Sequence, residues 1–202
     1  KVFEILSDFY GCPNYFWDCG YGLDPESMDY YKGEIQGLIG FLEERTGRPL
    51  DWDRLKEALH LSRRAMDCWR QIGELRQAVP CPSGFNEGMR DFTIMASCSG
   101  LPEAVRYFEH RRREVEGRVA RGEGLLPQER YRLAWLLPPP MFDPGLHDWL
   151  AQEYGAVVVM DSLSHLAGDM ALDPEEPLDF LAKKRFQLHL LKEVYRPVKT
   201  GG

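Results

Sequence analysis

The 202-residue chain is long enough for one domain or two small ones, and its 44% hydrophobic residues can bury a core. A formal net charge of −7 excludes the overall basic excess that is typical of nucleic-acid-binding proteins. The sequence contains no run of about 18 apolar residues, so it predicts no membrane span.

The ends of the chain and its cysteines indicate its cellular setting. Lys1–Leu6 contains neither an initiator Met nor the long apolar stretch of a signal peptide, so we expect a processed or trimmed chain. Lys199–Gly202 is interpreted as a flexible tail or a cut point. The five cysteines are irregularly spaced, which favours reduced thiols in the cytoplasm over a disulfide framework. No Cys-x-x-Cys pair occurs, so no structural zinc site is predicted.

The amino-terminal quarter combines an aromatic cluster with a strong helix signal. We interpret Tyr15–Trp17 as a short buried strand. A helix is predicted to follow, with Asp24 as its N-cap and Pro25 in its first turn. Apolar residues recur at helical spacing over Met28–Leu42, and Gly47 ends the helix.

Three more helices are predicted before residue 122. The first begins at Asp51 and runs for about 27 residues, roughly 40 Å, until Pro80 stops it. The second covers Gly84–Ser97, and the third begins at Pro102. The third carries the basic run His110–Arg113, which nearby glutamates offset. This run therefore predicts a solvated helix face rather than a phosphate-binding patch.

From residue 130 the pattern changes to strand, helix, strand. Leu133–Leu137 and Ala156–Met160 are short apolar runs, typical of parallel strands buried on both faces. The short helix between them contains His147 and ends at Gly155, and a further helix is expected over Pro177–Val194. The predicted fold class is therefore α/β, with a mostly helical block followed by the start of a parallel-sheet domain of flavodoxin or Rossmann type.

The loops after these two strands are the candidate binding site, because ligands of open parallel sheets bind beyond the carboxyl ends of the strands. His165 could act as a general acid or base, or be an ordinary loop histidine. Asp161 could contact a ligand or cap a turn. The predicted substrate-lining residues are Pro138, Met141, Asp161, Ser164 and His165.

Motifs for other chemistries are absent. The sequence contains neither GxGxxG nor GxxxxGK[ST], so no nucleotide site is predicted, and it lacks the GxSxG of many hydrolases. A stand-alone hydrolase or transferase that uses Cys98 or His165 remains a hypothesis without a placed partner residue.

Several segments together resemble the 2-hydroxyacyl-CoA dehydratase and benzoyl-CoA reductase family, and the similarity covers nearly the whole chain. The "YY…E…L…LE…TG" helix pair, the turn after the long helix and the opening of the second α/β domain carry the resemblance. These segments are Asp29–Ile35, Phe41–Leu50, Arg54–Ala58, Pro82–Gly84, Arg132–Pro138 and Leu150–Asp161.

The resemblance implies an enzyme of anaerobic metabolism that acts on an acyl-CoA by radical chemistry, as a dehydratase (a lyase) or as a reductase of an aryl ring (an oxidoreductase). Subunits of this family have two similar α/β domains and pair with a second homologous subunit. They bind a [4Fe-4S] cluster through cysteines and receive electrons from an ATP-dependent activator. By this resemblance, residues 1–124 are the end of the first α/β domain plus a helical connector. Residues 125–202 begin the second.

The resemblance also implies that the cluster ligands lie outside this chain. We therefore assign no cysteine to a cluster and no catalytic residue, although Cys12 and Cys19 would be the first to test if iron were found. The chain is expected to be a central fragment that is inactive alone. The alternative is a non-catalytic scaffold or interaction protein that retains part of this fold and binds a partner through residues 24–121.

Overall fold

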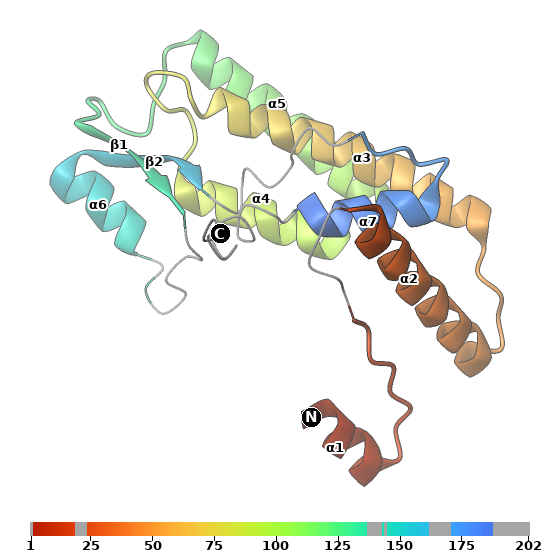
Figure 1. The fold of residues 1–202 in the computed structure, drawn as a ribbon. Helices are drawn as coiled ribbons and strands as arrows, with labels where there is room; N and C mark the ends of the chain where they lie inside the picture. Colours follow the sequence, from red (N-terminus) through yellow and green to blue (C-terminus); the bar gives the residue numbers. More distant parts are fainter. Residues whose placement is uncertain (1, 19–23, 137–142, 144, 162–170, 188–202) are drawn as a thin grey trace, which may run out of the picture.

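A computed structural model describes residues 2–18, 24–136, 143, 145–161 and 171–187. A body of helices carries a small parallel sheet at one end, while the amino-terminal helix α1 (Val2–Tyr10) stands apart from that body (Figure 1). The predicted α/β class, with a mostly helical block before a parallel sheet, is confirmed.

Helix α2 (Pro25–Thr46) has the predicted boundaries. The Asp24 carboxylate accepts a hydrogen bond from the Ser27 backbone N–H at 2.9 Å. At the other end, Gly47 adopts the left-handed conformation with φ 64°, which favours glycine because it has no side chain. The apolar stripe of the helix faces inward, as its buried residues Met28, Tyr31 and Ile35 show.

Helix α3 (Trp52–Leu75) packs along α5 (Pro102–Ala120), and these two helices hold most of the core. Asp51 caps α3 as predicted, but the helix ends at Leu75, five positions before the proline that was expected to stop it. Trp69 packs near the rings of Phe92 and Phe108, with ring centroids 6.5 and 6.4 Å away. The other core residues shared by these helices include Leu59, Ala65, Ile72, Val105 and Val115.

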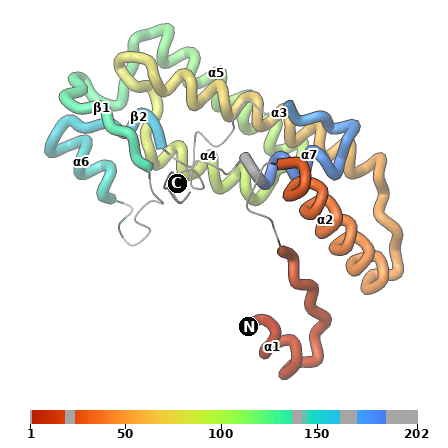
Figure 2. Tube along the Cα trace, viewed as in Figure 1, coloured from red at the N-terminus to blue at the C-terminus, as the bar shows by residue number. Residues whose placement is uncertain are grey.

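The carboxy-terminal helix returns to the helical body. Helix α4 (Phe85–Cys98) matches the helix predicted over Gly84–Ser97, and α7 (Pro177–Gln187) covers the described part of the last predicted helix. Helix α7 packs against α2 and α3, as Figure 2 also shows, and buries Phe180 and Ala182 completely. The chain beyond residue 124 therefore helps to complete the core of the helices before it.

Strands β1 (Tyr131–Trp135) and β2 (Ala156–Asp161) are hydrogen-bonded parallel neighbours, which confirms the predicted strand–helix–strand unit. Helix α6 (Leu146–Tyr154) connects them and ends at Gly155, which has φ 64° as its C-cap role requires. β1 begins two residues earlier than predicted. It is also more exposed than predicted, because among the described residues its one strand neighbour is β2; Tyr131 is 51% exposed.

The strand that was predicted before α2 is absent. Tyr15–Trp17 forms no strand, and Phe16 is 72% exposed. Trp17 instead stacks on Tyr31 of α2, with ring centroids 5.7 Å apart, so a side-chain contact replaces the expected sheet. Helix α1 was not predicted, and none of its residues is buried. Among the residues described, no helix combines the length and apolar character needed to cross a bilayer.

Candidate functional site

The carboxyl edge of the two-stranded sheet is the site that the sequence predicted. Trp135 and Asp161, the last residues of β1 and β2, are partners in the register, so the two strands end side by side. Asp161 is the predicted lining residue whose position is described. The other four lie outside the described residues: Pro138, Met141, Ser164 and His165.

Asp161 forms a buried ion pair with Arg76, which follows the last turn of α3. The Arg76 Nη1 donates to Asp161 Oδ2 at 2.8 Å, and the two side chains are 1% and 2% exposed. The same guanidinium donates to the Val158 carbonyl at 2.9 Å and to the Ser83 carbonyl at 3.2 Å. A charged pair can be buried only when hydrogen bonds replace its water, and Arg76 meets that requirement. This arginine thus fastens β2 to the helical body.

His147 lies at the same edge, in the first turn of α6. Its ring stacks on Phe85 at a centroid distance of 3.6 Å and meets the edge of Trp135 at 4.8 Å. The imidazole is 7% exposed, and its Nε2 makes no hydrogen bond with the described part of the chain. Burial lowers the pKa of His147 below its ordinary value, although the Asp161 carboxylate opposes that effect.

This arrangement combines an aromatic wall with a neutral imidazole at neutral pH. A buried Nε2 without a partner can donate or accept one hydrogen bond, depending on its tautomer, from a group that enters the edge of the sheet. The sequence placed His147 in a helix and did not identify it as a site residue. The sequence shows that His147 follows the loop after the first predicted strand. Its stacking on Phe85, 62 positions away, can be seen only in the folded protein.

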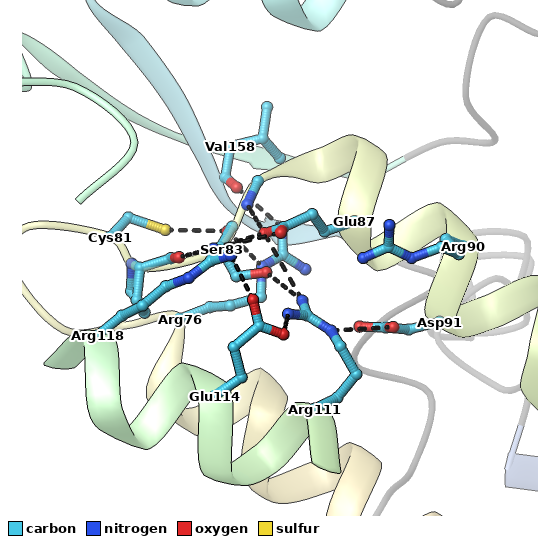
Figure 3. A network of polar contacts seen from close by, with 12 residues as sticks. Arg76, Cys81, Ser83, Glu87, Arg90, Asp91, Arg111, Glu114, Arg118 and Val158 are labelled. Carbon is cyan, nitrogen blue, oxygen red and sulfur yellow. Dashed lines mark hydrogen bonds and ion pairs between the residues drawn. The ribbon is translucent and has the colours of Figure 1, made fainter. Parts of the chain in front are cut away.

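A second cluster of polar side chains surrounds the turn between α3 and α4 (Figure 3). Arg111 of α5 donates to Glu114 at 2.7 Å and to the Ser83 hydroxyl at 3.1 Å. Arg118 donates to the Pro82 carbonyl at 2.9 Å and lies 3.2 Å from Glu87. These contacts join the turn to α5, so the cluster stabilises the helical body beside the sheet.

Burial and charge act in opposite directions on two carboxylates of this cluster. Burial would raise the pKa of Glu87, but hydrogen bonding by Ser83 and the charges of Arg111 and Arg118 outweigh it and lower that pKa. Asp91 is 1% exposed, and burial raises its pKa despite a 2.6 Å hydrogen bond from Tyr107. Arg111 Nε lies 3.5 Å from Asp91 Oδ1 without hydrogen-bond geometry, so this pair interacts by charge alone.

The cluster also corrects the interpretation of the basic run His110–Arg113. Arg111 is 2% exposed rather than solvated. The prediction was wrong at Arg111 because it assumed that glutamates close in the sequence offset the basic run on a solvent-exposed helix face. Glu87 and Asp91 of another helix meet Arg111 inside the protein instead.

The described cysteines do not form an iron–sulfur ligand set by themselves. Cys68 and Cys81 are buried, and burial raises the pKa of each thiol, which disfavours the thiolate that binds iron. Cys12 is exposed and Cys98 is partly buried. Within the described ranges, no three His, Cys, Asp or Glu side chains group as metal ligands would. Cys19, the other thiol to test, lies outside those ranges.

The parallel strand–helix–strand unit, together with the helices before it, defines an α/β protein built on a helical body. Residues 1–193 match the family model for the 2-hydroxyglutaryl-CoA dehydratase D-component, and the chain belongs to that family.

Two proteins are similar to this chain in sequence. A subunit of the benzoyl-CoA reductase of Thauera aromatica is 29% identical over 200 residues, which cover 90% of this chain and 46% of that protein. The alpha subunit of the (R)-2-hydroxyglutaryl-CoA dehydratase of Acidaminococcus fermentans is 22% identical over 155 residues, which cover 71% of this chain and 32% of that protein. The chain therefore spans less than half the length of the curated relatives it matches.

Proposed function

We propose that this chain is part of a subunit of an iron–sulfur enzyme that acts on an acyl-CoA thioester by radical electron transfer. The family match over residues 1–193 carries the proposal. The names of both relatives support it, because one is a reductase and the other a dehydratase of a CoA thioester. The reaction is then a dehydration of a 2-hydroxyacyl-CoA or a reduction of an aryl-CoA ring.

The enzyme would need groups that the described residues do not supply. A [4Fe-4S] cluster would provide the electron chemistry, with ligands from outside the described part of the chain. A second homologous subunit and an ATP-dependent activator would be its partners, and the cytoplasm its location. The chain alone is then expected to be inactive.

Within that enzyme, the edge of the sheet would face the acyl-CoA. The proposed lining residues are Pro138, Met141, Asp161, Ser164 and His165. The Trp135, Phe85 and His147 rings pack together at this edge, and such a wall would keep water from a radical intermediate. Residues 1–124 and 125–202 are proposed as parts of two successive domains.

One observation favours a non-catalytic scaffold as the second candidate. The apolar and aromatic residues of α1 are largely exposed, as a partner-binding segment would be. These residues are Val2, Phe3, Ile5, Leu6, Phe9 and Tyr10. A scaffold would bind a partner without turning over any acyl-CoA.

Turnover by the protein at its native length separates these candidates. The protein would be produced anaerobically with its second subunit and activator, then supplied with ATP, reductant and either 2-hydroxyglutaryl-CoA or benzoyl-CoA. Conversion of a CoA thioester is expected. A stable complex that converts neither these thioesters nor a wider set of acyl-CoAs would contradict the proposal and favour the scaffold.

The same assay tests the position of the site. His147→Phe keeps the stacking ring but removes both nitrogens, so turnover is expected to fall by about tenfold or more if the imidazole meets the substrate. Trp149→Phe is the matched control, because Trp149 is on the same helix and is 49% exposed. Equal turnover by both variants would place the substrate elsewhere.

A further inference from the structure

A separate polar cluster lies where α3, α4 and α7 meet. The Lys184 ammonium of α7 donates to the Ser62 hydroxyl at 2.8 Å and to the Ser99 hydroxyl at 2.7 Å. The two hydroxyl oxygens are themselves 2.7 Å apart. Three polar groups from distant parts of the sequence thus form one compact set.

This set borders a large apolar cavity. The cavity has a volume of about 550 Å³ and lies among α2, α3, α4 and α7. Such a volume is within the range of small-molecule binding pockets. Its apolar walls include Ile35, Trp69, Phe92 and Met95, and its polar lining includes Ser99, Lys184 and Arg185. A pocket that is apolar except for a few convergent polar groups is typical of a ligand site.

The charge of Lys184 is not balanced in the described protein. No carboxylate contacts its ammonium among the described residues, and burial lowers the pKa of this side chain. The neighbouring Lys183 differs, because it pairs with the Asp179 carboxylate at 2.5 Å. Two hydroxyl groups solvate an ammonium less well than water or a carboxylate does, so an anion beside Lys184 would be favoured.

We propose that this cavity binds a small carboxylate with an apolar tail, such as a free aliphatic acid. The carboxylate accepts hydrogen bonds from Lys184 and Ser99, and the tail lies among the apolar side chains of α2, α3 and α4. An ammonium has three donors, and the hydroxyls of Ser62 and Ser99 take two of them, so one remains for the ligand.

The apolar walls of the cavity and the charge of Lys184 together favour this class of ligand. A neutral alcohol would leave the ammonium without a counter-charge, and an alkylammonium would be repelled by it. A nucleotide head group would bring phosphates and ribose against walls that are mostly apolar. Binding of such an acid needs neither a cluster nor a thioester, so it is independent of the proposed function.

Titration calorimetry of the protein at its native length with octanoate tests this site. Octanoate is expected to bind, and Lys184→Met is expected to weaken its binding by about tenfold or more, since the charge-assisted hydrogen bond is lost. Lys183→Met is the matched control and should bind as the wild type does. No binding of octanoate to the wild type, or equal binding by Lys184→Met, would overturn the inference.

A second variant tests the tail without touching the charge. Ala96 lines the cavity, so Ala96→Leu reduces its volume and should weaken octanoate while leaving acetate binding unchanged. Thermal denaturation shows whether each variant is folded. Octan-1-ol and octylamine at the same concentrations should not bind measurably. Binding of octylamine as tight as that of octanoate would also overturn the inference.

Discussion

Cationic side chains lie in two partly or fully buried places, and the groups that they contact differ between the two. Around the turn at Ser83, Arg76 and Arg111 meet carboxylates and carbonyls from three other elements. At the junction of α3, α4 and α7, Lys184 meets only hydroxyls among the described residues. The first group is complete and joins the sheet to the helices. By our proposal a ligand would complete the second, so the two groups differ in the balance of their charge rather than in burial alone.

The largest effect is expected from Arg76→Met. It leaves the buried Asp161 carboxylate without its partner and two carbonyls without a donor, so the free energy of unfolding should fall by about 3–5 kcal/mol. Urea denaturation measures it. The double variant Arg76→Met with Asp161→Leu should recover part of the loss, and a loss below about 1 kcal/mol in the single variant would show that the pair is not buried.

A smaller and pH-dependent effect is expected from Glu87→Gln. The pKa of Glu87 is lowered in the folded state, so its contribution is present above its ordinary value of 4.5 and is lost as pH falls through the folded-state pKa. The free energy of unfolding of the variant should be lower by about 1.5 kcal/mol at neutral pH. It should also change less steeply with pH in the acid range. Parallel urea curves between pH 3 and pH 7, over about 4 units of pH, test this; identical slopes for both proteins would contradict it.

Lys184→Met is expected to raise the free energy of unfolding rather than lower it. Removal of an unbalanced ammonium should stabilise the ligand-free protein by about 1 kcal/mol at neutral pH, while Ser62 and Ser99 keep their mutual hydrogen bond. The pKa of Lys184 is lowered in the folded state, so the unfolded chain binds more protons above that pKa. Wild-type stability therefore gains from rising pH up to the ordinary value of 10.5, and the variant should lack this gain. A destabilised variant would show that Lys184 is structural.

The smallest effect is expected at an exposed pair. Arg70 and Glu74 lie one turn apart on α3 with side chains 37% and 58% exposed. Arg70→Ala should cost about 0.3–0.5 kcal/mol, and salt should reduce the difference. If this cost equalled that of Arg76→Met, the distinction between buried and exposed pairs would fail.

Local signals in the sequence were sufficient for most of the fold. Asp24 and Asp51 cap helices because their carboxylates reach the first-turn backbone N–H groups, and Gly47 and Gly155 end helices because left-handed backbone favours glycine. The parallel pairing of β1 and β2 followed from the strand–helix–strand order. Each of these features depends on residues close together in the chain.

The predictions that were wrong or missing concern contacts between residues far apart in the sequence. The aromatic cluster at Tyr15–Trp17 has strand-like composition, but Trp17 packs on Tyr31 of α2 instead. Arg76, His147 and Lys184 were not identified because their partners lie 85, 62 and 122 positions away in Asp161, Phe85 and Ser62. Only the folded chain shows which polar residue becomes buried and what it then meets.

Spectroscopy of the complex purified without oxygen tests the central claim most directly. The protein at its native length, isolated with the proposed second subunit, is expected to contain iron and acid-labile sulfide in equal amounts. The electron paramagnetic resonance signal of the reduced complex is expected to change when an acyl-CoA is added. An intact complex free of iron, or a signal unaffected by every acyl-CoA tried, would contradict the assignment of this chain to an iron–sulfur acyl-CoA enzyme.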